Sequence, residues 1–318
     1  MRRLGPPLAG GLDAVASGEW MGPRLIESST NGLLTDAPPL WRNNGSAGPA
    51  REDPDRLGRT VAFMTGAARV GWMKIHSTFG WATMDRAVAL AHERSTRVTG
   101  HCAYPLTLLA AGIDSKEHLG WQCSIHDSEV WYDDLVQLYA HAAVPIVPTR
   151  ALFSNTFRLN GAPAPPPTEV AGLFGPTELA GVSRSLNWYS VLTPGAAADL
   201  RNVTDAIDKL WRAGVVLGAG SDFERPDGIH YELEALVEAS LTPLQAIKAA
   251  TANAAHIIGA SGDIGRIAPG LLADVVLLDA DPTADIRNTR RVWAVIQGGR
   301  VVDREALVRA GWDPLPGR

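Results

Sequence analysis

Short apolar runs alternate with stretches of helical periodicity between residues 70 and 222, and this alternation constrains the fold more than any other feature. Strands are predicted at residues 70–75, 97–102, 113–118, 143–149 and 215–222, and helices at residues 84–94, 105–111, 129–141 and 196–213. Apolar runs separated by single helices are typical of parallel strands with crossover helices. The sequence therefore predicts an α/β architecture, either an open sheet or a barrel.

The C-terminal part of the chain has a different pattern. Residues 274–279 and 292–302 are predicted strands joined by turns, with no helix between them, as in a small β-sandwich. We therefore predict two domains. Residues 1–262 form the α/β domain, and residues 263–318 form the C-terminal part of a composite β-sandwich.

Composition and charge argue against several classes of function. The 318 residues are 46% hydrophobic, which is enough for a large core, and the net charge of −5 gives no electrostatic reason to expect nucleic acid or an anionic membrane as a partner. Two cysteines are too few for a disulfide framework. No run has the length of a membrane span and no signal-peptide pattern is seen, so a cytoplasmic protein is predicted.

Four predicted strands end, or nearly end, in a side chain that can bind a metal: Lys74, His101, His118 and Asp222. Each has an ordinary alternative explanation, because a lone histidine is often a hydrogen-bonded core residue and a lone aspartate can cap a helix. Chemistry in parallel α/β folds lies where strands end and loops begin. Four such residues on successive strands therefore predict a site for Zn²⁺ or a similar divalent ion.

Two further histidines lie near these strand ends in the sequence. His76 follows Lys74 by two residues and so shares its face of the strand. His230 follows Asp222 by eight residues, in a predicted loop above the rim, where a substrate contact and an ordinary surface histidine are both consistent with the pattern. Neither a G-x-S-x-G nucleophile motif nor a G-x-x-x-x-G-K-[ST] phosphate loop is present.

In their order and spacing, several segments resemble the amidohydrolase superfamily, in particular its imidazolonepropionase-like and prolidase-like dipeptidase branch. The similar segments are Trp-Met-Lys-Ile at 72–75, the histidine segments at 98–104 and 111–118, Gly-Ala-Gly-Ser-Asp at 218–222, and residues 263–278. In this family they correspond to barrel strands 4, 5, 6 and 8 and to the return of the chain into the sandwich. The resemblance implies a TIM-like (β/α)8 barrel.

The resemblance also implies a mechanism and a set of roles. Lys74 would be carboxylated and bridge two metals, His101 and His118 would bind one of them, and Asp222 would touch the other and act as the proton shuttle. One or two divalent ions, of which zinc is the expected metal, would activate a water. The implied reaction is hydrolysis of an amide-type carbon–nitrogen bond in a small dipeptide or cyclic amide, with His230 as a substrate contact.

The N-terminal side of the family pattern is not found. The first strand of the family carries a His-x-His pair that supplies two metal ligands, and this sequence contains no His-x-His. Residues 22–28 resemble the third strand, so we predict an incomplete barrel of strands 3–8; a full barrel takes about 250 residues.

Two interpretations remain open. In the first, the chain is an N-terminally truncated form of a binuclear hydrolase. In the second, it is a degenerate homologue that binds one metal or none and acts as a scaffold or small-molecule binding module. The unpaired strand edge of an incomplete barrel predicts a homo-oligomer.

Overall fold

The computed structural model describes residues 54–66, 71–75, 81–101, 105–119, 130–152, 158–159, 162–163, 196–222 and 227–306. The predicted strand at residues 22–28 and the side chain of His76 lie outside these ranges. The chain divides into two compact units, one of residues 1–127 and 132–146 and the other of residues 128–131 and 147–318. The predicted domain boundary at residue 262 stays a prediction.

The first unit is built around a parallel sheet. Its strands lie in the order β1 (Trp72–Ile75), β2 (Arg97–Gly100), β3 (Ser115–Glu117) and β4 (Ile146–Val147). β1 pairs with β2 and β2 with β3, both in parallel, with Lys74 opposite Thr99 and Gly100 opposite Lys116. The parallel arrangement confirms the α/β prediction.

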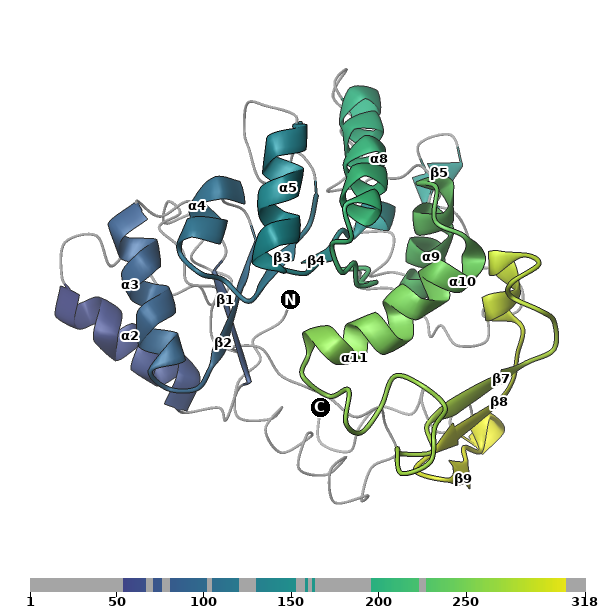
Figure 1. Cartoon of the computed structure of the whole chain (residues 1–318). Helices are drawn as coiled ribbons and strands as arrows, with labels where there is room; N and C mark the ends of the chain where they lie inside the picture. The colour runs from purple at the N-terminus through teal and green to yellow at the C-terminus, as the bar shows by residue number, and fades with distance from the viewer. Residues whose placement is uncertain are drawn as a thin grey trace. The chain divides into compact units, whose positions relative to one another are not determined.

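Helices follow the strands of this sheet as the alternation predicts. They are α2 (Pro54–Gly66), α3 (Trp81–His92), α4 (Pro105–Ala110) and α5 (Asp133–Ala142), and Figure 1 shows α3, α4 and α5 alongside the strands. α5 begins with two aspartates, whose charge suits the positive end of the helix dipole, and it is followed by Ala143 in the left-handed conformation, which ends the helix. Buried Met73, Ile75 and Val98 belong to the core between these layers.

The second unit contains most of the remaining helices. It includes the short 3-10 helix η3 (Arg150–Leu152) and the paired strands β5 (Arg158–Leu159) and β6 (Ala162–Pro163). The helices that follow in the chain are α8 (Ala196–Arg212), α9 (Gly228–Glu238), α10 (Pro243–Lys248), the π-helix η5 (Ala249–Asn253) and α11 (Ala254–Ile257). α10 begins with a capping box in which Thr242 and Gln245 bond each other's backbone amides, with Pro243 at the first helical position.

Residues 215–222 do not form the strand that the sequence predicts. They contain a single bridge residue, Leu217. The π-helix η5 supplies hydrogen bonds to this segment instead: Asn253 Nδ2 donates to the Leu217 carbonyl at 2.8 Å, and the Ala219 amide donates to the Ala249 carbonyl at 3.2 Å. The apolar run is therefore held partly by a helix.

The C-terminal sheet is separate from the parallel sheet and antiparallel. Its strands are β7 (Val275–Leu278), β8 (Val292–Gln297) and β9 (Arg300–Val301), with the 3-10 helix η6 (Ile286–Arg290) between β7 and β8. Gly298 and Gly299, both with positive φ, interrupt the predicted strand at 292–302 and form the turn.

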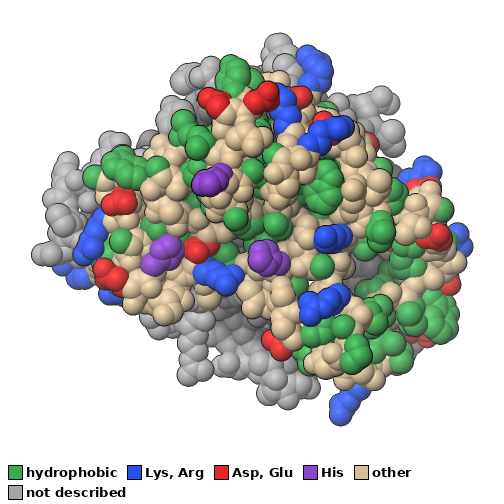
Figure 2. Space-filling view, in the orientation of Figure 1, with side chains coloured by type: hydrophobic (Ala, Val, Ile, Leu, Met, Phe, Trp, Pro, Cys, Tyr) green, Lys and Arg blue, Asp and Glu red, His purple; other side chains and the backbone are tan. Residues whose placement is uncertain are grey.

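Hydrophobic side chains are exposed on this sheet, among them Val276, Trp293 and Val301 (Figure 2). The separate antiparallel sheet confirms the predicted change of pattern at the C-terminal end, whereas the incomplete barrel stays a prediction. None of the helices in the described ranges combines the length and the hydropathy that a membrane span requires.

Candidate active site

Three of the predicted metal-binding residues lie together at the ends of adjacent strands of the first unit. Lys74 Nζ lies 3.5 Å from His118 Nε2. The imidazole rings of His101 and His118 meet edge to face, with centroids 4.3 Å apart and an interplanar angle of 82°. Both histidines are buried, with exposed fractions of 7% and 1%. The sequence prediction that these three side chains converge is consistent with this geometry.

The strand pairing explains how two of these residues reach the same place. Lys74 lies on β1 between buried Met73 and Ile75, so its side chain leaves the opposite face of the strand from theirs. The ladder continues past the end of β2, because the His101 amide donates to the Ile75 carbonyl at 2.7 Å. His101 is therefore fixed beside the end of β1.

His118 is placed by a buried lysine that the sequence analysis gave no role. His118 has φ of 63°, in the left-handed region that few non-glycine residues adopt. Lys116, which is completely buried, donates from Nζ to the His118 carbonyl at 2.7 Å. The sequence gives no clear signal for this contact, because Lys116 lies in a polar run, Asp-Ser-Lys-Glu-His at 114–118.

The donors in this cluster suit a divalent metal in kind. Imidazole nitrogen is a common ligand of zinc and its neighbours, and His101 and His118 supply two such groups. Within the described ranges, no group of three histidine, cysteine, aspartate or glutamate side chains is arranged to hold a metal. Lys74 could add a further ligand at this cluster, because its amine becomes an oxygen donor if it is carboxylated.

Asp222, the fourth predicted ligand, belongs to the second unit. It is exposed and has φ of 47°, so it also adopts the left-handed conformation. The segment that precedes it is tightly packed: a Cβ atom added at Gly220 would lie 2.8 Å from Val147 Cγ1, and one at Gly218 would lie 3.2 Å from Val147 Cγ2. Glycine is required at both positions for the backbone to come this close.

His230 lies on helix α9, so its predicted placement in a loop was wrong. Its Nδ1 is 3.0 Å from Thr289 Oγ1, and that hydroxyl donates its proton to the Ile286 carbonyl at 2.8 Å. The imidazole must therefore donate from Nδ1 to the threonine oxygen.

Burial, together with the charge of Arg290, lowers the pKa of His230 to about 4, although Asp227 acts in the opposite direction. The helix forms because packing against η6 overrides the turn-like Pro-Asp-Gly sequence at 226–228.

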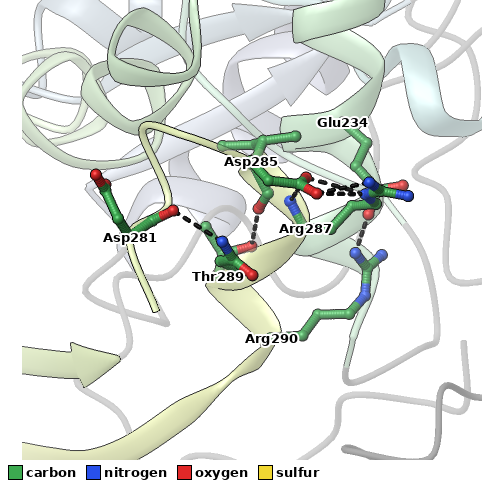
Figure 3. A network of polar contacts seen from close by, with 8 residues as sticks. Glu234, Asp281, Asp285, Arg287, Thr289 and Arg290 are labelled. Carbon is green, nitrogen blue, oxygen red and sulfur yellow. Dashed lines mark hydrogen bonds and ion pairs between the residues drawn. The ribbon is translucent and has the colours of Figure 1, made fainter. Parts of the chain in front are cut away.

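Contacts beside His230 join α9 to η6. Arg290 bonds Glu234 of α9, and its guanidinium carbon lies 4.5 Å from the centroid of the Tyr231 ring. Figure 3 shows the Arg290 side chain reaching Glu234 close to the Asp285–Arg287 ion pair. His230 is thus part of the packing between these two helices, and its predicted contact with substrate stays a prediction.

A buried carboxylate on α9 was missed by the sequence analysis. Glu232 is completely buried and accepts hydrogen bonds from the amides of Arg150 at 3.1 Å and Ala151 at 2.7 Å. Burial raises the pKa of Glu232 to about 7, although these amides and the Arg150 charge oppose the rise. The buried residues Ala235 and Leu236 follow it by three and four positions, a spacing that places Glu232 on the inner face of the helix.

Solved structures share the fold of this chain. The structure of a putative prolidase from Bifidobacterium longum has a TM-score of 0.69 at 22% identity and covers 96% of this chain and 74% of its own. A Xaa-Pro dipeptidase with bound methionine in its active site has a TM-score of 0.67 at 20% identity and covers 92% of this chain and 71% of its own. Both similarities are of fold.

Curated relatives match shorter parts of the sequence. An imidazolonepropionase of Rubrobacter xylanophilus is 33% identical over 96 residues, which are 29% of this chain and 23% of the relative. An ochratoxinase of Aspergillus niger is 29% identical over 201 residues, or 62% of this chain and 35% of the relative. The matches thus span from under a quarter to about a third of these relatives.

The sequence profile of the amidohydrolase family matches residues 12–302, which include both compact units almost completely. Members of this family generally bind divalent metals. The chain belongs to the amidohydrolase family.

Proposed function

We propose that this protein hydrolyses an amide-type carbon–nitrogen bond in a small substrate, a dipeptide or a cyclic amide, with the help of a divalent metal of the zinc type. The observation that carries the proposal is the convergence of Lys74, His101 and His118 from the ends of three adjacent parallel strands. Membership of the amidohydrolase family and the similarity to an imidazolonepropionase and to prolidase structures support it.

Each residue has a distinct task in this proposal. His101 and His118 offer imidazole nitrogens to the metal, and Lys74 offers carbamate oxygens after reaction with CO₂. Bound there, the metal would lower the pKa of a water and polarise the scissile carbonyl. The Asp222 carboxylate would accept the proton of the attacking water and pass it to the leaving nitrogen, and it would offer an oxygen to the metal.

The burial of the histidine pair favours this chemistry. His101 and His118 are almost without solvent contact, so water competes weakly with a bound ion and the charges at the site interact more strongly than they would in water. The left-handed conformation of His118, held by Lys116, is consistent with a residue whose geometry is set by function rather than by local preference.

The test combines metal analysis with turnover. The purified chain is analysed for bound metal by elemental mass spectrometry and assayed on Xaa-Pro dipeptides, N-acyl amino acids and cyclic amides, with and without added Zn²⁺. We expect metal-dependent hydrolysis that is lost in His118→Ala and in Asp222→Asn. The control is His141→Ala, because His141 is exposed on α5 and has no role in the proposal.

Two outcomes would contradict the proposal. Equal turnover in wild type, His118→Ala and Asp222→Asn would refute the assigned roles. Absence of metal and of turnover in the folded wild-type chain would instead favour a homologue that acts as a scaffold or a small-molecule binding module.

A further inference from the structure

The carboxylate of Glu232 bonds two successive backbone amides at the start of the 3-10 helix η3. Residues 149–151, which include these two amides, are called the turn here. Oε1 accepts from the Arg150 amide at 3.1 Å, and Oε2 accepts from the Ala151 amide at 2.7 Å. Hydrogen bonds to a carboxylate are among the stronger ones in proteins, and two of them to different oxygens fix both position and orientation. The turn that follows β4 is therefore attached to the inner face of α9.

This turn begins with a residue in an unfavourable conformation. Thr149 has φ of 49°, and its side chain is β-branched, so the left-handed region is strongly disfavoured for it. Such a conformation persists only where surrounding contacts determine it. The bonds from Glu232 to the two following residues are contacts of this kind.

The same turn packs against the segment that leads to Asp222. A Cβ atom at Gly220 would lie 2.8 Å from Val147 Cγ1 and 3.9 Å from Thr149 Cγ2, so Val147 packs closely on Gly220 and Thr149 lies next to it. Asn253 bonds the Leu217 carbonyl from the π-helix. A displacement of the turn would therefore move the backbone two residues before Asp222.

We propose that Glu232 is a positioning residue for Asp222: by holding the turn at residues 149–151 against residues 218–220, it fixes the backbone that carries the Asp222 carboxylate. The inference rests on the proposed function, in which Asp222 transfers the proton. It assigns to helix α9 a role in the reaction that is exerted through packing and not through contact with substrate.

The chemistry of the two amide donors explains why this residue is a carboxylate. Burial raises the pKa of Glu232 to about 7, so the ionised form is costly to keep inside the protein. A glutamine would be cheaper to bury, but it has one acceptor oxygen and would turn its amide N–H groups toward the second backbone donor. Two adjacent amides thus require two acceptor oxygens.

The test compares Glu232→Gln with the matched variant Glu238→Gln. Glu238 lies on the same helix, but its side chain is 52% exposed and bonds the Arg150 guanidinium at 2.7 Å, not the backbone amides that Glu232 bonds. Hydrogen–deuterium exchange is followed by mass spectrometry over residues 147–152 and 215–222, and kcat and KM are measured on the substrate found in the turnover assay.

We expect Glu232→Gln to increase exchange in both peptides and to lower kcat by at least about tenfold with little change in KM, since a positioned proton-transfer group contributes about 10²–10⁴-fold. Glu238→Gln should change neither. Increased exchange confined to residues 147–152, or an unchanged kcat, would overturn the inference. If Glu232→Gln does not fold, Glu232→Asp serves the same test, because it is too short for both oxygens to reach both amides.

The two proposals fail in different ways. Absence of turnover in the wild-type chain refutes the proposed function, and with it the catalytic part of this inference. The exchange comparison then still decides whether Glu232 controls the conformation of residues 215–222.

Discussion

Replacing His230 by glutamine should change how the stability of this protein depends on pH. In the native state, burial and the charge of Arg290 lower the pKa of His230 from 6.5 to about 4. Between these values the unfolded chain binds a proton that the native state does not, so the histidine lowers the free energy of unfolding as the pH falls. The shift corresponds to a loss of up to about 3 kcal/mol.

Glu232 acts in the opposite direction over nearly the same range. Burial raises its pKa from 4.5 to about 7, so the native state binds the extra proton and the free energy of unfolding rises as the pH falls from about 7 to 4.5. The gain is again up to about 3 kcal/mol. In the wild type the two contributions nearly cancel between pH 4.5 and 6.5.

The His230→Gln variant should remove one side of this balance. Glutamine has no group that titrates in this range, so no proton is taken up at this position. Loss of the bond from Nδ1 to Thr289 Oγ1 would lower the free energy of unfolding by the same amount at every pH. Relative to wild type, the variant should therefore gain up to about 3 kcal/mol as the pH falls from 6.5 to about 4.

Urea unfolding followed by circular dichroism at several pH values in this window measures the difference. His141→Gln, an exposed histidine on α5, is the control and should parallel the wild type. A constant difference in unfolding free energy between His230→Gln and wild type at every pH would show that the native imidazole titrates normally and would refute the reasoning.

Two further variants test the packing of the second unit. Arg290→Met removes a buried cation from Glu234, whose side chain is 15% exposed. Because a largely buried carboxylate then loses its ion pair, the free energy of unfolding should fall by about 3 kcal/mol in urea titrations. A change below about 0.5 kcal/mol would mean that this ion pair stabilises the protein no more than a pair on the surface does. Gly220→Ala places a methyl group 2.8 Å from Val147 Cγ1 and should lower the free energy of unfolding by about 1–3 kcal/mol, measured by thermal unfolding. The control Gly262→Ala, with nothing within 4 Å of the added atom, should leave the stability nearly unchanged. Equal effects of the two substitutions would contradict the tight packing of residues 218–220.

The residues of the first unit that carry the proposed site could be predicted because the pattern that reveals them is local. Each of Lys74, His101 and His118 lies in or directly after a strand, and parallel strands place their carboxyl ends at one edge of the sheet. Alternation alone was enough to bring the three side chains together. Their separation and the buried partner Lys116 depend on packing and could not be read from the pattern.

The second unit was harder to predict because its bonds are not local. The run at residues 215–222 has the composition of a buried strand, but its hydrogen-bond partners include Ala249 and Asn253, far along the chain in a π-helix. Likewise, helix α9 begins at Gly228, where Pro-Asp-Gly indicates a turn, because the buried residues Tyr231 and Leu236 stabilise it against its neighbours.

Three residues at the ends of predicted strands share a backbone conformation that no sequence pattern indicates. His118, Thr149 and Asp222 all have φ between 47° and 63°, where glycine would be the locally favoured choice. Each of these conformations costs about 1–3 kcal/mol, and such a strained conformation persists only where the surrounding contacts determine it.

Lys116 bonds the carbonyl of His118, and Glu232 bonds the amides of the two residues after Thr149. The two buried charged side chains that the sequence analysis missed therefore hold the chain at, or directly after, these strained positions. Because Val147 and Thr149 lie beside Gly220, two residues before Asp222, we expect the third strained residue to depend on the second, and the exchange experiment on Glu232 measures this dependence.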